Sequence, residues 1–206
     1  KSEREEKFGR LALRVRAREQ LEKSLRLRQE LAKTPVEIAD MVYSLLQLGK
    51  IYKNISTTER ELLKASDSKL LSGKAQECFQ EAIRLSQENL GKHELTSSCY
   101  KNLGDLFLTT KEYLKAEEKY IQAKEMRENL GLNANESFVF LLNNLGQCLT
   151  INNKATEAIE ILESARDMAE KLAENDEQNV CKTKVYAYLA IAYDSIENNI
   201  DAVNYA

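Results

Sequence analysis

The fold of this chain is decided by two stretches of its sequence, Tyr100-Lys-Asn-Leu103-Gly104-Asp-Leu-Phe107 and Leu142-Asn-Asn-Leu145-Gly146-Gln-Cys-Leu149. The two stretches are forty-two residues apart, and each places a large residue, a Leu-Gly pair and a second large residue at i, i+3, i+4 and i+7. This spacing puts all four positions on one face of an α-helix. Glycine inside a helix costs about 1 kcal/mol relative to alanine. Its return at the same place therefore indicates that a neighbouring helix packs closely against it.

A second apolar pattern follows each stretch after a short polar turn. It consists of two alanines with a large residue between them, spaced i, i+4 and i+7, and its two copies are again forty-two residues apart. The copies are Ala116, Tyr120 and Ala123, and Ala158, Leu162 and Ala165. Two amphipathic helices joined by a short turn pack antiparallel, so each unit predicts a helical hairpin.

The same pattern recurs twice more along the chain. An earlier copy begins at Leu45 and ends with Ala75, Phe79 and Ala82, and fourteen extra residues separate its halves. A later copy begins at Tyr186, forty-four residues after the second stretch. Self-similarity at such a period is the signature of a repeat architecture.

The composition agrees with an all-helical chain. Seven glycines and one proline in 206 residues are too few for the frequent turns of a β-sandwich, a β-barrel or a Rossmann domain. Hydrophobic residues make up 43% of the chain, charged residues make up 31%, and the mean hydropathy is -0.51. These values predict a folded, water-soluble protein with a substantial core.

Charge is balanced overall, at -3, but residues 1–33 carry eleven basic and six acidic side chains. Within that segment Arg10, Arg14 and Arg18 recur every four residues and predict a basic stripe on a helix. A solvated helix face explains the stripe, and contact with RNA or phosphate is the alternative.

Metal binding, catalysis and membrane insertion are not expected. The four cysteines form no CxxC pair, and His93 is the single histidine, so no zinc set, cofactor motif or catalytic triad can be assembled. No apolar run reaches the length of a membrane span or resembles a signal peptide. The cysteines are best explained as reduced, buried thiols, which predicts a cytoplasmic protein.

The repeated residues resemble the tetratricopeptide repeat. The ordinary repeat of that family has about thirty-four residues, whereas the period here is forty-two to forty-four. With Asn89-Leu-Gly-Lys-His93 and Asn129-Leu-Gly-Leu-Asn133, the longer period is similar to that of the kinesin-light-chain type. The resemblance implies a right-handed α-solenoid of antiparallel helix hairpins, with about nine or ten helices.

We expect residues 1–206 to form a single array. Its parts are a long N-terminal helix or partial repeat at 1–33, a repeat at 34–92 with an insertion at 54–73, repeats at 93–133 and 134–176, and a truncated repeat at 177–206. The insertion, which is rich in leucine, is expected to form a short helix that folds onto the array, with a docking element as the alternative. Thr34, Pro35 and Glu37 form a start signal for the first helix of the first repeat.

The resemblance also implies that the first helix of each repeat lines a concave groove. Asn102 and Asn144 match the asparagines that hold the main chain of a bound peptide in light-chain-type repeats. The expected groove residues are Tyr43, Gln47, Lys50, Lys101, Asn102, Asp105, Phe140, Asn143, Asn144, Gln147, Lys184 and Tyr188.

The function that these features predict is a non-enzymatic protein-interaction scaffold that binds an extended peptide or partner segment. One alternative is a regulatory or sensor segment of a larger signalling protein, such as a nucleotide-binding immune receptor. Another is an array that contacts RNA through the Arg10–Arg18 stripe, although nucleic acid is not the partner we expect. Half-repeats at both ends would leave open faces for self-association.

Overall fold

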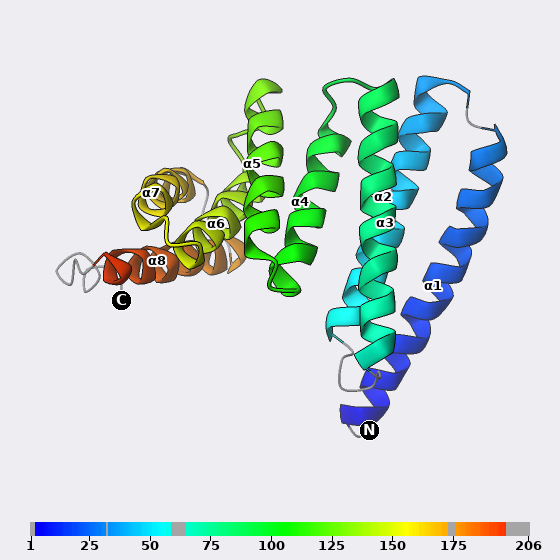
Figure 1. The fold of residues 1–206 in the computed structure, drawn as a ribbon, viewed down its shortest axis with the longest axis horizontal. Coiled ribbons are helices and arrows are strands. Elements are labelled where there is room, and N and C mark those ends of the chain that lie inside the picture. The colour runs from blue at the N-terminus through cyan, green and yellow to red at the C-terminus, as the bar shows by residue number, and fades with distance from the viewer. Residues whose placement is uncertain (1–2, 32, 59–64, 173–175, 197–206) are drawn as a thin grey trace. The chain divides into compact units, whose positions relative to one another are not determined.

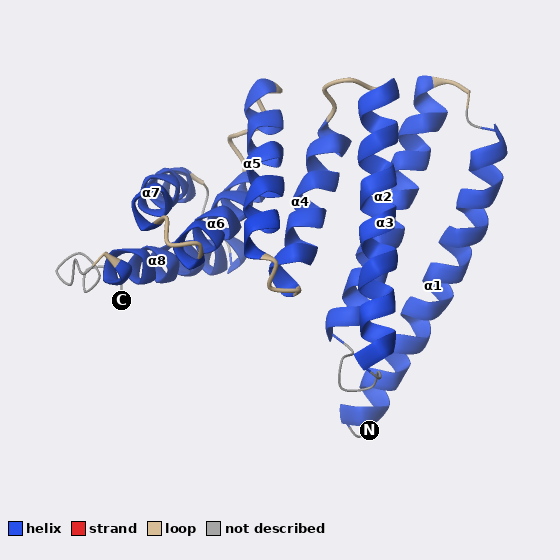
Figure 2. Ribbon diagram, viewed as in Figure 1, coloured by secondary structure: helices blue, strands red, loops and turns tan. Residues whose placement is uncertain are grey.

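The regular structure is entirely α-helical in the residues that the computed structural model describes, which are 3–31, 33–58, 65–172 and 176–196 (Figure 2). Eight helices follow one another along these ranges (Figure 1). Their bounds are α1 Glu3–Leu31, α2 Pro35–Thr58, α3 Ala65–Asn89, α4 Glu94–Thr109, α5 Tyr113–Asn129, α6 Glu136–Ile151, α7 Ala155–Lys171 and α8 Asp176–Ser195. The all-α class predicted from the sequence is confirmed.

The chain divides into two compact units, Lys1–Thr109 with α1 to α4 and Thr110–Ala206 with α5 to α8. In the first unit α2 packs against α1, α3 and α4, and α3 also packs against α4. In the second unit α6 packs against α5, α7 and α8, and α7 also packs against α8. In each unit, helices that are neighbours in sequence pack together, and α2 also packs against α4 and α6 against α8. Stacked helical hairpins show this arrangement. The grouping of both units into a single array of the stated repeats stays a prediction.

Fully buried alanines mark the contacts of the second helices. Ala116, Tyr120 and Ala123 on α5 are each 0% exposed. The equivalent positions on α3 and α7 are also 0% exposed, namely Ala75, Phe79, Ala82, Ala158, Leu162 and Ala165. Small residues on both sides of a large one let the helix backbones approach while the large side chain fills the space between them. The repeated sequence pattern is therefore the core of each hairpin.

The glycine of the Leu-Gly pair is a packing notch in two of the hairpins. A Cβ atom added at Gly49 on α2 would lie 2.5 Å from Cε1 of Phe79 on α3. A Cβ atom added at Gly146 on α6 would lie 2.5 Å from Cγ of Leu162 on α7. Both distances are far shorter than van der Waals contact, so neither place has room for a methyl group. The close approach expected from the sequence is confirmed at these two positions.

The insertion at 54–73 lengthens two helices instead of adding a separate short one. The described part of α2 continues to Thr58, and α3 begins at Ala65. The hydroxyl group of Ser68 donates to the carbonyl oxygen of Ser56 at 2.8 Å, and both serines are buried. The described parts of the insertion form no separate helix, because these side chains continue the α2–α3 hairpin by bonding across it. This partly explains why the described ranges hold eight helices where nine or ten were expected for the whole chain. Leu62 and Leu63 lie outside the described residues.

The start of α2 carries a complete capping box. The backbone N–H of Thr34 donates to Oε2 of Glu37 at 2.9 Å, and the N–H of Glu37 donates to Oγ1 of Thr34 at 3.3 Å. The Thr34 hydroxyl group also donates to the Glu37 carboxylate at 3.0 Å. Hydrogen bonds from the backbone N–H groups of Lys33 and Thr34 and from this hydroxyl group lower the pKa of Glu37. The start signal predicted from the sequence is confirmed.

Replacing Thr34 with alanine is expected to lower the free energy of unfolding by about 1 kcal/mol, the usual cost of losing an N-cap side chain.

Because the folded-state pKa of Glu37 is below its ordinary value, the contribution of its carboxylate is fully present at neutral pH. It is lost as the pH falls through that lowered pKa. Urea unfolding should therefore show a penalty for Glu37→Gln at pH 7 that shrinks in acid. An equal penalty at both pH values would contradict the capping role.

Candidate functional site

The twelve groove residues expected from the sequence lie on α2, α4, α6 and α8. The first unit carries Tyr43, Gln47, Lys50, Lys101, Asn102 and Asp105, and the second carries Phe140, Asn143, Asn144, Gln147, Lys184 and Tyr188. Ten of them are exposed or half-exposed, whereas Asn102 is 7% exposed and Asn143 is 0% exposed. Each unit therefore presents its own set of polar and aromatic side chains from its first helices.

A lysine cluster, formed by Lys50, Lys53 and Lys101 around Asp105, dominates the set in the first unit. The amino groups of Lys53 and Lys101 lie 3.4 Å and 3.0 Å from Oδ2 of Asp105. Lys50 has no ion pair among the residues that the structure describes, and partial burial lowers its pKa, helped by the charges of Lys101 and Lys53. Two of the three lysines thus pair with the single carboxylate of Asp105, and the net positive charge of the cluster attracts anions.

Lys53 was not among the residues expected from the sequence. It lies on α2, three residues after Lys50, so helical spacing brings the two close together. The repeat pattern follows apolar and small residues and gives no weight to this position. The i, i+3 pair of Lys50 and Lys53, considered together with Asp105 on the first helix of the next repeat, is the signal that could have found it.

The two asparagines that match the family's peptide-holding positions already bond within the chain. Nδ2 of Asn102 donates to the carbonyl oxygen of Ser98 at 2.8 Å. Nδ2 of Asn144 donates to the hydroxyl group of Tyr120 at 3.4 Å. A partner would therefore have to compete for these amide donors or use the side-chain carbonyl oxygens instead.

Asn143 lies in the interface between α6 and α8. Its Nδ2 contacts Sγ of Cys181 at 3.9 Å, and its buried Oδ1 has no hydrogen-bond partner among the described residues. Its side chain has no exposed surface, so Asn143 contributes to helix packing in this structure. Its neighbour Asn144 is half-exposed on the same helix.

The expected groove residues of the second unit are mainly aromatic and amide side chains. The amino group of Lys184 on α8 lies 5.4 Å from the centroid of the Phe140 ring on α6. Tyr188, one turn further along α8, is half-buried, and burial raises its pKa, with a smaller contribution from Cys148. Such a surface offers apolar contact with one cation beside it.

The cysteines are free thiols of low reactivity in this structure. Cys99 and Cys181 are buried, and burial raises their pKa values to about 12 and about 11. Cys78 is half-buried and its pKa is raised to about 12, again mainly by burial. These groups stay protonated at neutral pH, whereas the thiolate is the nucleophilic form. Within the described ranges no group of three or more His, Cys, Asp or Glu side chains could hold a metal ion.

None of the helices in the described ranges is both long enough and apolar enough to cross a bilayer.

Comparison with known proteins supports the repeat assignment. A tetratricopeptide repeat family model matches residues 72–129, and no curated protein sequence matches the chain. The nearly identical TPR-like repeats of a Podosopora anserina protein named as a kinesin light chain align with a TM-score of 0.69 at 15% identity. That alignment covers 94% of this chain and 84% of the other. A single-residue variant of the same protein gives a TM-score of 0.70 at 15% identity over the same shares of both chains.

A further solved structure, BtubC (BKLC) from P. vanneervenii, aligns with a TM-score of 0.61 at 18% identity. This alignment covers 95% of the present chain and 88% of BtubC. At these identities the structural likeness establishes the fold, and the sequence match adds the repeat family over α3 to α5. Residues 72–129 are therefore tetratricopeptide repeat, and the chain has the fold of the TPR-like repeats in the Podosopora anserina structure.

Proposed function

We propose that this chain is a non-enzymatic protein-interaction module whose first helices bind an extended segment of a partner protein. Tetratricopeptide folds generally serve as interaction scaffolds, because stacked hairpins present long, continuous helix surfaces. The observation that carries the finer proposal is the lysine cluster on α2 and α4. It supports a partner segment that carries acidic side chains.

The charge balance of the lysine cluster is the physical reason for an acidic partner. Asp105 compensates one positive charge, while Lys50 remains partly desolvated and repelled by Lys53 and Lys101. A carboxylate from a partner would form charge-assisted hydrogen bonds with these amino groups and offset that repulsion. Binding would therefore favour the protonated form of Lys50 and raise its pKa back toward the ordinary value.

The set in the second unit supports contact with apolar side chains of a partner. Phe140 and Tyr188 offer ring surface for a partner's apolar side chains, and Lys184 adds a cation beside them. Asn144 and Gln147 are half-exposed on α6, and amide side chains can bond a peptide backbone whatever its sequence.

The compartment we propose is the cytoplasm, where the free thiols would remain reduced. The same surface would serve equally well in a stand-alone scaffold and in the regulatory segment of a larger signalling protein. Binding measurements on this chain test the surface in both settings.

The double variant Lys50→Ala/Lys101→Ala is expected to weaken binding of an acidic peptide by about tenfold or more, which corresponds to about 1.4 kcal/mol. The probe is a blocked, fluorescein-labelled octapeptide of alternating glutamate and serine, titrated by fluorescence anisotropy. A peptide with glutamine in place of glutamate controls for charge. Lys69→Ala is the control variant for the loss of a lysine outside the cluster, because Lys69 is exposed on the second helix α3 of the same unit.

Equal binding by the double variant and the Lys69→Ala control would refute the assignment of the lysine cluster. The variant Asn102→Ala/Asn144→Ala tests the amide positions with the same peptide, and weaker binding is the expected result. Since both amide groups also bond within the chain, circular dichroism of that variant must show an unchanged fold before its affinity is interpreted.

A further inference from the structure

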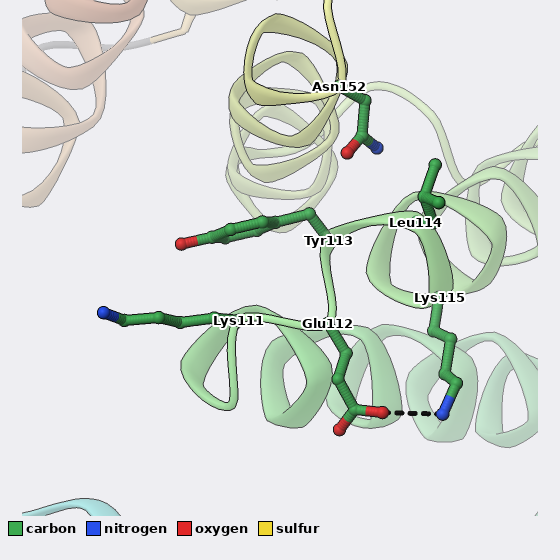
Figure 3. A pocket seen from close by; sticks show the side chains of 6 residues that line it. All are labelled: Lys111, Glu112, Tyr113, Leu114, Lys115 and Asn152. Atoms are coloured by element: carbon green, nitrogen blue, oxygen red, sulfur yellow. Dashed lines mark hydrogen bonds and ion pairs between the residues drawn. The ribbon is translucent and has the colours of Figure 1, made fainter.

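A hollow of about 400 Å³ lies in the second unit, between the start of α5 and the turn that joins α6 to α7. Its lining is Lys111, Glu112, Tyr113, Leu114, Lys115 and Asn152 (Figure 3). It shares no residue with the twelve groove positions or with the lysine cluster. Its volume is in the range of pockets that hold small groups in proteins.

Hydrogen bonds to the buried carboxylate of Glu117 hold one side of this hollow. Glu117, on the first turns of α5, is 5% exposed. Its carboxylate accepts from Nδ2 of Asn152 at 2.6 Å and from the amino group of Lys154 at 2.6 Å. Charge-assisted bonds of this length hold the α6–α7 turn against α5. These bonds therefore fix the position of Asn152 on one side of the hollow.

Two lysines and one glutamate line the hollow. Glu112 and Lys115 pair with each other at 2.6 Å and so cancel. Lys111 makes no ion pair in the part of the chain that the structure describes. In Figure 3 its side chain and that of Tyr113 extend in the same direction, away from the Glu112–Lys115 pair. Their amino and hydroxyl groups are thus available to one anionic group.

Apolar surface accompanies this cation. Leu114 is 71% exposed, and the ring of Tyr113 forms part of the lining beside it. In Figure 3 the Leu114 side chain and the Tyr113 ring extend in different directions, so each offers its own apolar surface to another apolar side chain. The hollow thus combines apolar walls with the amino group of Lys111 at its edge.

The backbone provides a matched comparison for Lys111 within the chain. Lys111 has φ 66, and Asn153, the equivalent turn residue forty-two positions later, has φ 61. Asparagine is strongly enriched in this left-handed conformation, whereas other non-glycine residues adopt it with difficulty. Lys111→Asn should therefore leave the turn at least as stable while removing the cation.

We propose that this hollow is a second binding site, one that takes a large apolar side chain and the neighbouring carboxylate of an extended partner segment. The apolar side chain packs against the ring of Tyr113, and the carboxylate accepts from the amino group of Lys111 and the hydroxyl group of Tyr113. Glu117 and Asn152 are positioning residues that hold the opposite wall. The site works independently of the lysine cluster, so either can be disproved alone.

The test uses the blocked peptide acetyl-Ser-Leu-Glu-Ser-amide and the same peptide with glutamine in place of glutamate. The protein is the full chain carrying Lys50→Ala/Lys101→Ala, so that acidic peptide held at the lysine cluster does not contribute. Backbone amide shifts from NMR titration should move at residues 111–115 and 152, with affinity at least about fivefold higher for the glutamate peptide. Lys111→Asn should abolish that preference while keeping the unfolding midpoint, and Lys111→Arg should retain it.

Three results would overturn the proposal. They are unchanged shifts at residues 111–115 and 152, equal affinity for the two peptides, and a folded Lys111→Asn variant that binds like its parent.

Discussion

Replacing Gly146 with alanine is expected to lower the free energy of unfolding by about 1–3 kcal/mol, the usual cost of overpacking a core. Alanine should gain up to about 1 kcal/mol in helix propensity. A net loss of stability therefore requires a packing penalty larger than this gain. The new methyl carbon would lie 2.5 Å from Cγ of Leu162, whose side chain is 0% exposed and closely packed, so that moving it would disturb the core. Urea unfolding followed by circular dichroism measures the change.

A control and a rescue accompany this prediction. Gly73 on α3 has nothing within 4 Å of its missing Cβ atom, so Gly73→Ala should stabilise the protein by about 0.5–1 kcal/mol. In Gly146→Ala/Leu162→Ala the clash is removed, and the penalty should be smaller than the sum of the two single penalties. If Gly146→Ala stabilised the protein as Gly73→Ala does, the notch would be disproved.

Replacing Arg127 with alanine is expected to cost about 2–4 kcal/mol, from a buried acceptor left unpaired and from the space the side chain leaves. Arg127 is 5% exposed at the end of α5. Its Nε donates to the carbonyl oxygen of Leu132 at 3.1 Å, and its Nη2 donates to Oδ1 of Asn135 at 2.9 Å. The same Asn135 oxygen accepts from the N–H of Phe138 and so caps α6. Arg127 therefore joins the end of one helix to the start of the next.

The lysine variant separates the charge of Arg127 from its geometry. A single amino group cannot reproduce two diverging N–H donors, so Arg127→Lys should recover only part of the lost stability. Hydrogen exchange should show the loss first at the start of α6, where the cap is weakened. A penalty of less than 0.5 kcal/mol for Arg127→Ala, within the usual range for surface substitutions, would contradict this role.

The hairpins could be predicted from the sequence because their determinants are repeated. Gly49 and Gly146 occupy equivalent positions in two repeats and lie against Phe79 and Leu162. Phe79 and Leu162 also occupy equivalent positions in these repeats. Such positions depend on helix periodicity, which a sequence displays directly. The insertion was misjudged because its leucines fit both a separate helix and a longer one. The bonding across the hairpin, from Ser68 and Ser72 to Ser56, favours the longer helices and is not visible in the sequence pattern.

Buried charges could not be predicted in the same way. Arg127 and Glu117 stand where the other repeats carry uncharged residues, such as Ala169 and Ile159 forty-two positions later. Their burial depends on partners in the following turns, which no periodic pattern specifies. Asn143 illustrates the same limit, since its helix face was predicted from spacing but its burial depends on how closely α8 packs.

The central claim is that the first helices carry the binding surface, and chemical-shift mapping with the alternating glutamate–serine octapeptide tests it most directly. In the first unit we predict that the largest backbone amide shifts fall on α2 and α4, around Lys50, Lys53 and Lys101. We also predict that they disappear when glutamine replaces glutamate. Shifts confined to the second helix α3, or shifts that persist with the glutamine peptide, would contradict the account.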